Sequence, residues 1–168
     1  DKIVAIPTAN AFRWTMLNLG EVRIAGLDLA MQASARMGNG FYLDGRLNYT
    51  YQKARDVTDP SSEFYGGQIP YIPWHSGSAA LTMSYRDWEL NYSFIYTGER
   101  YTSQANTTEN YLLPWYTNDL ALARNLPLKQ GNLRLTLEVN NLFNQQYEVV
   151  LCYPMPGINF KLIAQYEF

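Results

Sequence analysis

Apolar and polar residues alternate with a period of two at the end of the chain. The apolar positions are Ile158, Phe160, Leu162, Ala164, Tyr166 and Phe168, and the polar positions are Asn159, Lys161, Gln165 and Glu167. Because successive side chains of a β-strand point to opposite faces, this segment is predicted to be a strand with one continuous apolar stripe. The stripe ends on Tyr166 and Phe168, and aromatic rings of this kind form the girdles of membrane barrels.

The same alternation recurs upstream and predicts six further strands. They lie near residues 21–35, 41–52, 74–85, 88–97, 119–123 and 133–140. A partial strand is also predicted at residues 3–6. The chain is therefore predicted to be all-β, with seven to eight strands.

The predicted connections are short and long in turn. Short turns are expected at residues 37–40, 86–87 and around 127–131, and long loops at 53–73, 98–114 and 141–156. The first turn contains Asn39-Gly40, a dipeptide that tight hairpins prefer. Short turns on one side of a sheet and long loops on the other are typical of bacterial outer-membrane barrels.

The predicted strands have an apolar face, which suits contact with lipid, and a polar face, which suits contact with a water-filled lumen. In hydrocarbon every backbone polar group must be paired within the protein, so a β-structure spans a membrane only as a closed sheet. The charged residues Arg46, Arg134, Glu138 and Lys161 all fall on the polar face. One of them at the lipid midplane would cost about 2–4 kcal/mol. We therefore predict an antiparallel transmembrane β-barrel segment.

Composition supports this fold class and argues against others. A net charge of −2 and a mean hydropathy of −0.29 indicate neither a nucleic-acid-binding protein nor a helical membrane protein. The 14 tyrosines suit interfacial belts. Cys152 is the only cysteine, so an internal disulfide and a thiolate metal cluster are excluded. Since no signal segment precedes residue 1, we expect a removed leader or a piece of a longer polypeptide.

Three motifs resemble the C-terminal end of TonB-dependent outer-membrane receptors. The sequence reads LEVNNLFNQQY at 137–147, YPMPGINF at 153–160 and YEF at 166–168. The family pattern is N-L-F-(N/D)-x-x-Y, then Y-P-x-P-G-R-x-(F/Y) and an aromatic end, with Ile158 here where Arg is common. Further matches are GEVRIAGLD at 20–28, IPYIPWH at 69–75 and YTGERY at 96–101. The resemblance covers nearly the whole chain.

The resemblance implies a barrel of about twenty-two strands plugged by an N-terminal domain. Such receptors import siderophore-iron, cobalamin or glycans across the bacterial outer membrane, among membrane lipid and lipopolysaccharide. Residues 1–168 are predicted to be the C-terminal part of this barrel, with the plug domain absent. The implied partners are the rest of the barrel, the plug, TonB through the missing N-terminal region, and the barrel-assembly machinery. This part alone is not expected to transport a ligand.

Aromatic and basic residues in or beside the long loops are the candidate ligand-binding residues. They are Tyr65, Tyr71, Arg100, Tyr101, Tyr111 and Trp115. The alternative is that they form the upper aromatic girdle, and the sequence favours that alternative. The resemblance also implies that Tyr166 and Phe168 are the signal read by the barrel-assembly machinery.

No enzyme, cofactor or metal site is predicted. His75 has no second histidine, and Asp56, Asp59 and Glu63 lack the spacing of a calcium loop, so these residues are interpreted as structural or solvated. The sequons at Asn48, Asn91 and Asn106 are interpreted as chance. Two alternatives to the receptor stay open, namely a self-contained eight-stranded barrel with a structural or adhesive role and a soluble carbohydrate-binding β-sandwich.

Overall fold

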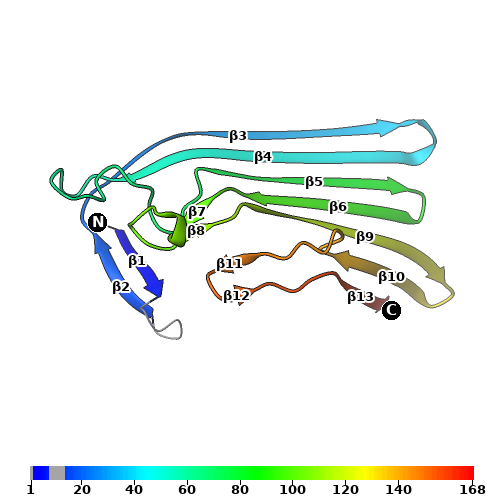
Figure 1. Cartoon of the computed structure of the whole chain (residues 1–168). Coiled ribbons are helices and arrows are strands. Elements are labelled where there is room, and N and C mark those ends of the chain that lie inside the picture. The colour runs from blue at the N-terminus through cyan, green and yellow to red at the C-terminus, as the bar shows by residue number, and fades with distance from the viewer. Residues whose placement is uncertain (1, 8–13) are drawn as a thin grey trace.

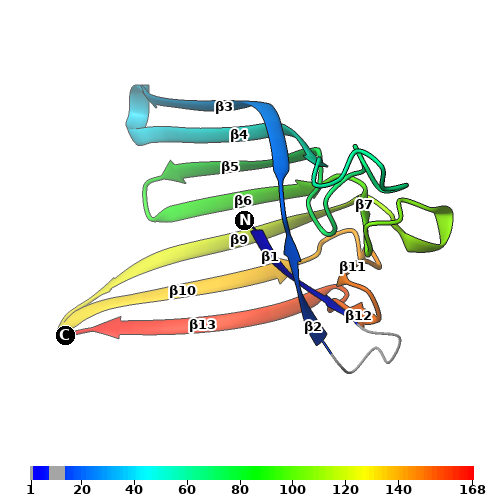
Figure 2. The same ribbon diagram turned by 90° about the vertical axis from the view of Figure 1, so that its left-hand side faces the viewer.

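The computed structural model describes residues 2–7 and 14–168 and is built of β-strands. Seven strands form one sheet: β3 (Val22–Met37), β4 (Phe41–Asp56), β5 (His75–Tyr85), β6 (Trp88–Thr97), β9 (Trp115–Leu128), β10 (Gly131–Asn140) and β13 (Asn159–Glu167). They follow one another in this order across the sheet, and every neighbouring pair is antiparallel. Figures 1 and 2 show a single curved layer.

Six shorter strands lie outside this sheet as three two-stranded pairs. The pairs are β1 (Lys2–Pro7) with β2 (Trp14–Leu19), β7 (Arg100–Tyr101) with β8 (Tyr111–Leu112), and β11 (Glu148–Val150) with β12 (Tyr153–Pro154). Two 3-10 turns complete the described elements, η1 (Gly38–Gly40) and η2 (Thr108–Asn110). In this part of the chain no helix has the length and apolarity to cross a bilayer.

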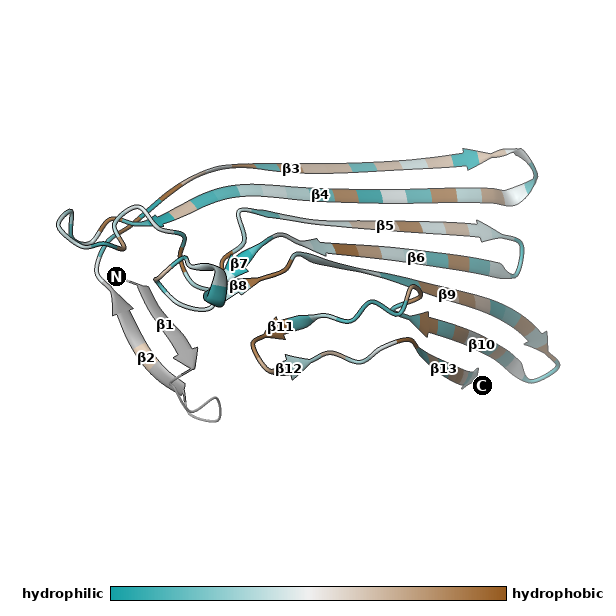
Figure 3. Ribbon diagram, in the orientation of Figure 1, coloured by the Kyte–Doolittle hydropathy of each residue, from teal (hydrophilic) through white to brown (hydrophobic). Residues whose placement is uncertain are grey.

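The strand register confirms the predicted faces. Leu137 pairs with Leu162 and Leu122, whereas Glu138 pairs with Lys161 and Ala121. Along each strand, apolar and polar residues therefore stay on the same two faces from strand to strand, and Figure 3 shows the resulting alternation of colours. Large apolar side chains are exposed on one face, among them Leu27, Met31, Leu47, Trp88, Leu137, Phe160 and Leu162.

A few positions break the alternation, and their contacts explain some of them. Asn118 pairs with Phe94 and so lies on the apolar face, yet it is buried and accepts a hydrogen bond from the Tyr92 hydroxyl. This bond lowers the cost of a polar group on an apolar surface. Ile95 and Ile163 lie on the polar face in register with Ser78 and Thr136.

The connections alternate in length as predicted. The short turns are residues 38–40, 86–87 and 129–130, at one end of the sheet, and the long loops 57–74, 98–114 and 141–158 lie at the other end (Figure 1). In the first turn Asn39 and Gly40 have φ of 66° and 79°, the left-handed region that Asn and Gly tolerate best. In outer-membrane barrels the short turns face the periplasm, so the predicted fold class would put these long loops at the extracellular end.

Three sequence-based assignments require correction. The partial strand at residues 3–6 exists, but it pairs with β2 in a separate hairpin. Residues 53–56 were predicted to be loop, yet β4 continues to Asp56 because β3 is equally long and pairs with it as far as Val22. Pro127 was placed in a turn but lies in β9, opposite Asn132 near the strand end, where the missing N–H costs little.

The described residues bury few apolar side chains. Ala54, Ile69, Pro70, Leu112 and Ala123 are the buried ones, and Ala54 and Ile69 form a small cluster that fastens the first long loop to β4. In residues 2–7 and 14–168 no second sheet packs against the apolar stripes, so the β-sandwich alternative does not describe this layer. The outer strands β3 and β13 each have one neighbour, and the sheet is open.

Candidate functional site

Four of the six predicted residues lie at the long-loop end of the sheet, in two aromatic pairs and as a buried arginine. Tyr101 and Tyr111 meet edge to face with ring centroids 5.6 Å apart, and Trp115 stacks on Tyr147 at 4.5 Å. Tyr147 was missed as a candidate site residue. Its signal in the sequence is the last position of the N-L-F-N-x-x-Y motif.

Arg100 holds the last long loop through its guanidinium. It is 3% exposed and donates hydrogen bonds to the carbonyls of Val149 at 3.2 Å, Glu148 at 3.3 Å and Leu113 at 3.5 Å. Burial lowers the pKa of this guanidinium, and nearby Tyr71 opposes the shift. A guanidinium committed to three main-chain carbonyls acts as an anchor of the loop, and a ligand-binding role for Arg100 stays a prediction.

Tyr71 and Tyr65 lie apart from the stacked pair. Tyr71 adopts a left-handed φ of 59°, and its N–H donates to the Tyr101 carbonyl at 2.9 Å. Burial raises the pKa of its hydroxyl above the ordinary value. Tyr65 is 46% exposed and lines a hollow of about 530 Å³ together with Phe64, Gln104 and Asn106.

A hollow of about 510 Å³ lies between the strand β8, the start of β9 and the last long loop. Its lining includes Tyr111, Leu113, Trp115, Gln146, Tyr147 and Glu148. Burial, with the nearby Asp119 charge as a smaller cause, raises the pKa of the Tyr147 hydroxyl. Two stacked rings beside an amide and a carboxylate suit a flat ligand that also carries polar groups. Two predicted residues, Tyr111 and Trp115, thus share one hollow.

Gln68 and Asn106 join the first two long loops. The Asn106 side chain accepts from Gln68 N and donates to the Gln68 carbonyl at 3.1 Å. The Gln68 side chain, in turn, donates to the carbonyls of Ile72 at 2.7 Å and Glu99 at 3.1 Å. The amide of the Asn106 sequon is therefore engaged in loop packing, and the Asn48 and Asn91 sequons lie within β4 and β6.

The acidic residues and the histidine have structural contacts. Asp56 accepts hydrogen bonds from Thr58 N at 2.9 Å and from the Gln104 side chain at 3.1 Å. The Ser61 hydroxyl and N–H donate to Asp59 and lower the pKa of its carboxyl. Within the described ranges no three His, Cys, Asp or Glu residues gather as metal ligands would. The His75 Nδ1 lies 2.8 Å from the Tyr49 hydroxyl.

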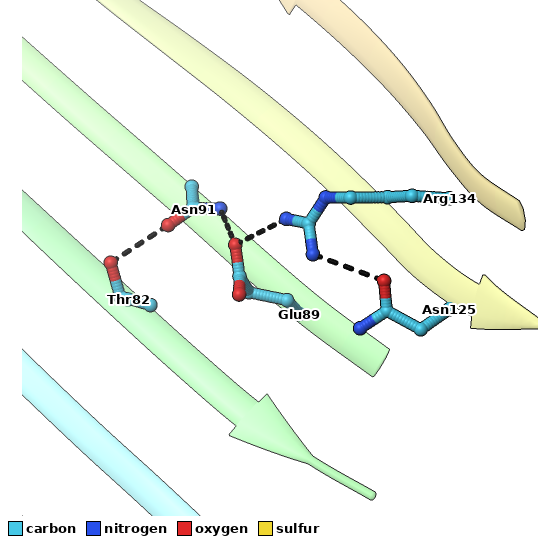
Figure 4. Close-up of polar contacts among 5 residues, drawn as sticks. All are labelled: Thr82, Glu89, Asn91, Asn125 and Arg134. Atoms are coloured by element: carbon cyan, nitrogen blue, oxygen red, sulfur yellow. Dashed lines mark hydrogen bonds and ion pairs between the residues drawn. The ribbon is translucent and has the colours of Figure 1, made fainter. Parts of the chain in front are cut away.

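A chain of polar side chains crosses four strands on the polar face (Figure 4). The Glu89 carboxylate accepts hydrogen bonds from the Arg134 guanidinium and from the Asn91 side-chain amide, both at 2.8 Å. The Thr82 hydroxyl donates to the Asn91 side-chain oxygen at 2.7 Å. Arg134 also donates to Asn125 at 3.2 Å. We call Thr82, Glu89, Asn91, Asn125 and Arg134 the polar chain. It was missed from the sequence because its members come from β5, β6, β9 and β10, although the alternation had placed Arg134 on this face.

Small residues between the polar side chains let them approach one another across the sheet. Ala123 stands in register between Glu89 and Thr136 and is 1% exposed, so its neighbours cover it. Nearby, a hollow of about 310 Å³ is lined by Thr82, Asn91, Asp119, Glu138 and Asn140. A hydrogen-bonding surface of this kind suits contact with water or with another polar protein segment.

Tyr166 and Phe168 lie at the end of the edge strand β13. The Tyr166 hydroxyl donates to the Gln130 carbonyl at 2.6 Å, and its ring meets Phe168 edge to face at 4.8 Å. Phe168 is fully exposed. These positions are compatible with a signal displayed on a strand edge, and their role in barrel assembly stays a prediction.

Comparison with known proteins places this geometry in a family. A family model described as "TonB dependent receptor-like, beta-barrel" matches residues 1–142. The unliganded ferric citrate transporter FecA shares 17% identity, with a TM-score of 0.65 over 73% of this chain and 20% of that chain. The ferric yersiniabactin uptake receptor FyuA from Yersinia pestis shares 18% identity, with a TM-score of 0.61 over 89% of this chain and 23% of that chain.

The copper transporter OprC has the same fold, with 18% identity and a TM-score of 0.61 over 95% of this chain and 26% of that chain. This chain therefore spans about a quarter of the length of the solved structures that it matches. Because the sequence identity to these solved structures is low, the similarity to them shows only a shared fold. The match to the family model, in contrast, covers most of the chain. The chain belongs to the β-barrel family of TonB-dependent receptors, which are proteins of the bacterial outer membrane.

Proposed function

We propose that residues 1–168 are the C-terminal part of the barrel of a receptor that imports a scarce nutrient across the outer membrane. The observation that carries the proposal is the single-layer sheet, whose apolar face is exposed while its polar face is cross-linked by hydrogen bonds. Such a sheet suits a wall between lipid and a plugged, wet lumen. The family membership of the chain supports the same role.

The nutrient class that we propose is a metal chelate. The solved structures that share this fold are named as transporters of ferric citrate, ferric yersiniabactin and copper. The aromatic hollow at the extracellular end suits the rings of an organic chelator, and Tyr65, Tyr111 and Trp115 are the accessible candidates for contact. Cobalamin and glycans are the other nutrient classes to be tested.

Each region of the chain has its own role in this proposal. The seven strands supply the wall, the three long loops supply part of the mouth, and the polar face contacts the plug. TonB would act through the N-terminal region of the receptor. The barrel-assembly machinery would recognise the strand that ends in Tyr166 and Phe168, and no enzymatic step is proposed.

Uptake by cells that lack the receptor tests this function. The gene that encodes this chain is deleted, and uptake of radiolabelled ferric chelates, copper, cobalamin and glycans is compared with the parent strain and with a strain lacking TonB. We expect the uptake of one metal chelate to fall by about tenfold or more in both mutants. If uptake of cobalamin or of a glycan is lost instead, the proposed import function stands and the proposed chelate class is wrong. Unchanged uptake of every nutrient would overturn the import function.

A further inference from the structure

Two arginines lie with two aromatic rings at the short-turn end of the apolar face. Arg124 is in register with Trp88, and its Cζ lies 4.8 Å from the centroid of that ring. Arg86 lies in the turn between β5 and β6, with its Cζ 5.1 Å from the Tyr85 ring. Tyr85 and Trp88 are the directly opposed pair that closes this turn. We call these four residues the basic-aromatic patch.

The patch is exposed and its arginines have no acidic partner in the described ranges. Trp88 is 43% exposed and Tyr85 is 40% exposed. The ion pairs found there involve Arg46, Arg134 and Lys161, all on the polar face. Neither arginine of the patch donates a hydrogen bond to a described side chain. Each guanidinium carries five N–H donors, which are therefore directed at what surrounds the sheet.

The position of the patch puts these charges at the membrane boundary. An arginine on the lipid face costs about 2–4 kcal/mol at the midplane but only about 0–1 kcal/mol near the interface. Trp and Tyr rings also prefer the interface, and the long arginine stem lets the head reach it. Because the short turns face the periplasm, the patch lies at the level of the headgroups of the periplasmic leaflet.

We propose that the basic-aromatic patch binds the phosphate of an anionic phospholipid from the periplasmic leaflet. Arginine forms paired hydrogen bonds to phosphate oxygens, and the two rings provide a surface for the glycerol and upper acyl carbons. Charge supports an anionic lipid, since the turn that carries Arg86 contains a single acidic residue, Asp87. The main-chain carbonyl of Asp87 accepts from Asn125 N at 2.8 Å, and its carboxylate makes no ion pair with either arginine.

Lipid titration of the receptor that carries this chain tests the proposal. The receptor is purified in a mild detergent, and phosphatidylglycerol, phosphatidylcholine or lipopolysaccharide is added while bound lipid is counted by native mass spectrometry. We expect tighter binding of phosphatidylglycerol than of phosphatidylcholine. The double variant Arg86→Gln/Arg124→Gln should weaken the binding of the first phosphatidylglycerol molecule by about tenfold. The matched control is Arg46→Gln, which removes an exposed arginine from the polar face and should bind as the parent does.

Three results would overturn the proposal. They are equal binding of the two phospholipids by the parent, unchanged phosphatidylglycerol binding by the double variant, and replacement of phosphatidylglycerol by lipopolysaccharide at the patch. Heat-modifiable migration in gels reports whether each variant is folded. If the double variant does not fold, the single variants decide, because parent-like binding by both would contradict the proposal. Arg124→Lys keeps the charge but loses the planar fork, so its binding should fall between the parent and Arg124→Gln.

Discussion

Arginine side chains of this chain occupy contrasting environments that their positions in the fold determine. Arg100 is buried among main-chain carbonyls, Arg134 lies in the polar chain, and Arg124 lies on the apolar face over an aromatic ring. The same side chain therefore serves as a loop anchor, a link between strands and a cation at the membrane boundary. Its sequence neighbours alone do not distinguish these roles.

Removal of the Arg100 guanidinium should loosen the last long loop. In Arg100→Met, the carbonyls of Leu113, Glu148 and Val149 lose their donor, and a buried group without a partner costs about 1–3 kcal/mol. We expect faster hydrogen exchange of residues 148–150 and earlier proteolytic cleavage in the loop. Arg46→Met, which removes an exposed arginine, is the control. Unchanged exchange in Arg100→Met would show that the anchor is unimportant.

The Glu89–Arg134 pair should be strongly coupled. Its atoms lie 2.8 Å apart and the pair belongs to the polar chain, whereas Glu138 and Lys161 lie 3.6 Å apart with Lys161 more exposed. Double-mutant cycles with Glu→Gln and Arg or Lys→Met changes, measured by urea unfolding from vesicles, should give about 0.5–3 kcal/mol for the first pair. The second pair should give less than about 1 kcal/mol. The reverse order would contradict this account of the polar chain.

At the scale of the strand, the register assigns every position to lipid or to the lumen side. Adjacent residues on one strand therefore differ in their tolerance of charge. Leu137 lies on the apolar face beside Leu122 and Leu162, and Thr136 lies on the polar face beside Ala123 and Ile163. This difference gives a direct test of the assignment.

Leu137→Arg should impair insertion far more than Thr136→Arg. A cation on the lipid face deep in the bilayer costs about 2–4 kcal/mol, while a cation in the lumen remains hydrated. The measurement is the folded fraction in phospholipid vesicles, read from heat-modifiable migration. Equal impairment by the two substitutions would show that the faces are wrongly assigned.

At the scale of the whole molecule, the short turns and the long loops separate to opposite ends of one sheet (Figure 1). The loops are packed through the Ala54–Ile69 cluster, the Gln68–Asn106 bonds and the Arg100 anchor. They therefore present preformed hollows to the extracellular side. A preformed hollow loses less conformational entropy when a ligand binds.

Trp115→Ala should weaken binding of the ligand that the uptake experiment identifies. The substitution removes one ring of the stacked pair in the hollow, and loss of a ring contact at a binding hot spot costs about 2 kcal/mol or more. Affinity is measured by titrating the purified receptor with that ligand. Tyr42→Ala, near the start of β4 at the opposite end of the sheet, is the matched control. Equal affinity of parent and Trp115→Ala would place ligand contact elsewhere in the mouth.

Local alternation was enough to determine the fold class, the seven strands of the sheet, their two faces and the order of short and long connections. These features depend on side-chain period and turn chemistry, which act between near neighbours. The strand end at Asp56 was missed because pairing with the long neighbouring strand β3 extends β4 beyond its own alternation. The motifs near the C-terminus identified the family, since they keep residue types at fixed spacing.

Only the tertiary structure decided which distant side chains meet. The pairing of Trp115 with Tyr147, the burial of Arg100 and the polar chain from Thr82 to Arg134 all join residues from different strands or loops. Such contacts depend on strand register and on the packing of loops, which no short segment of sequence contains. The alternation specified which face each side chain occupies, and the register specified its neighbour on that face.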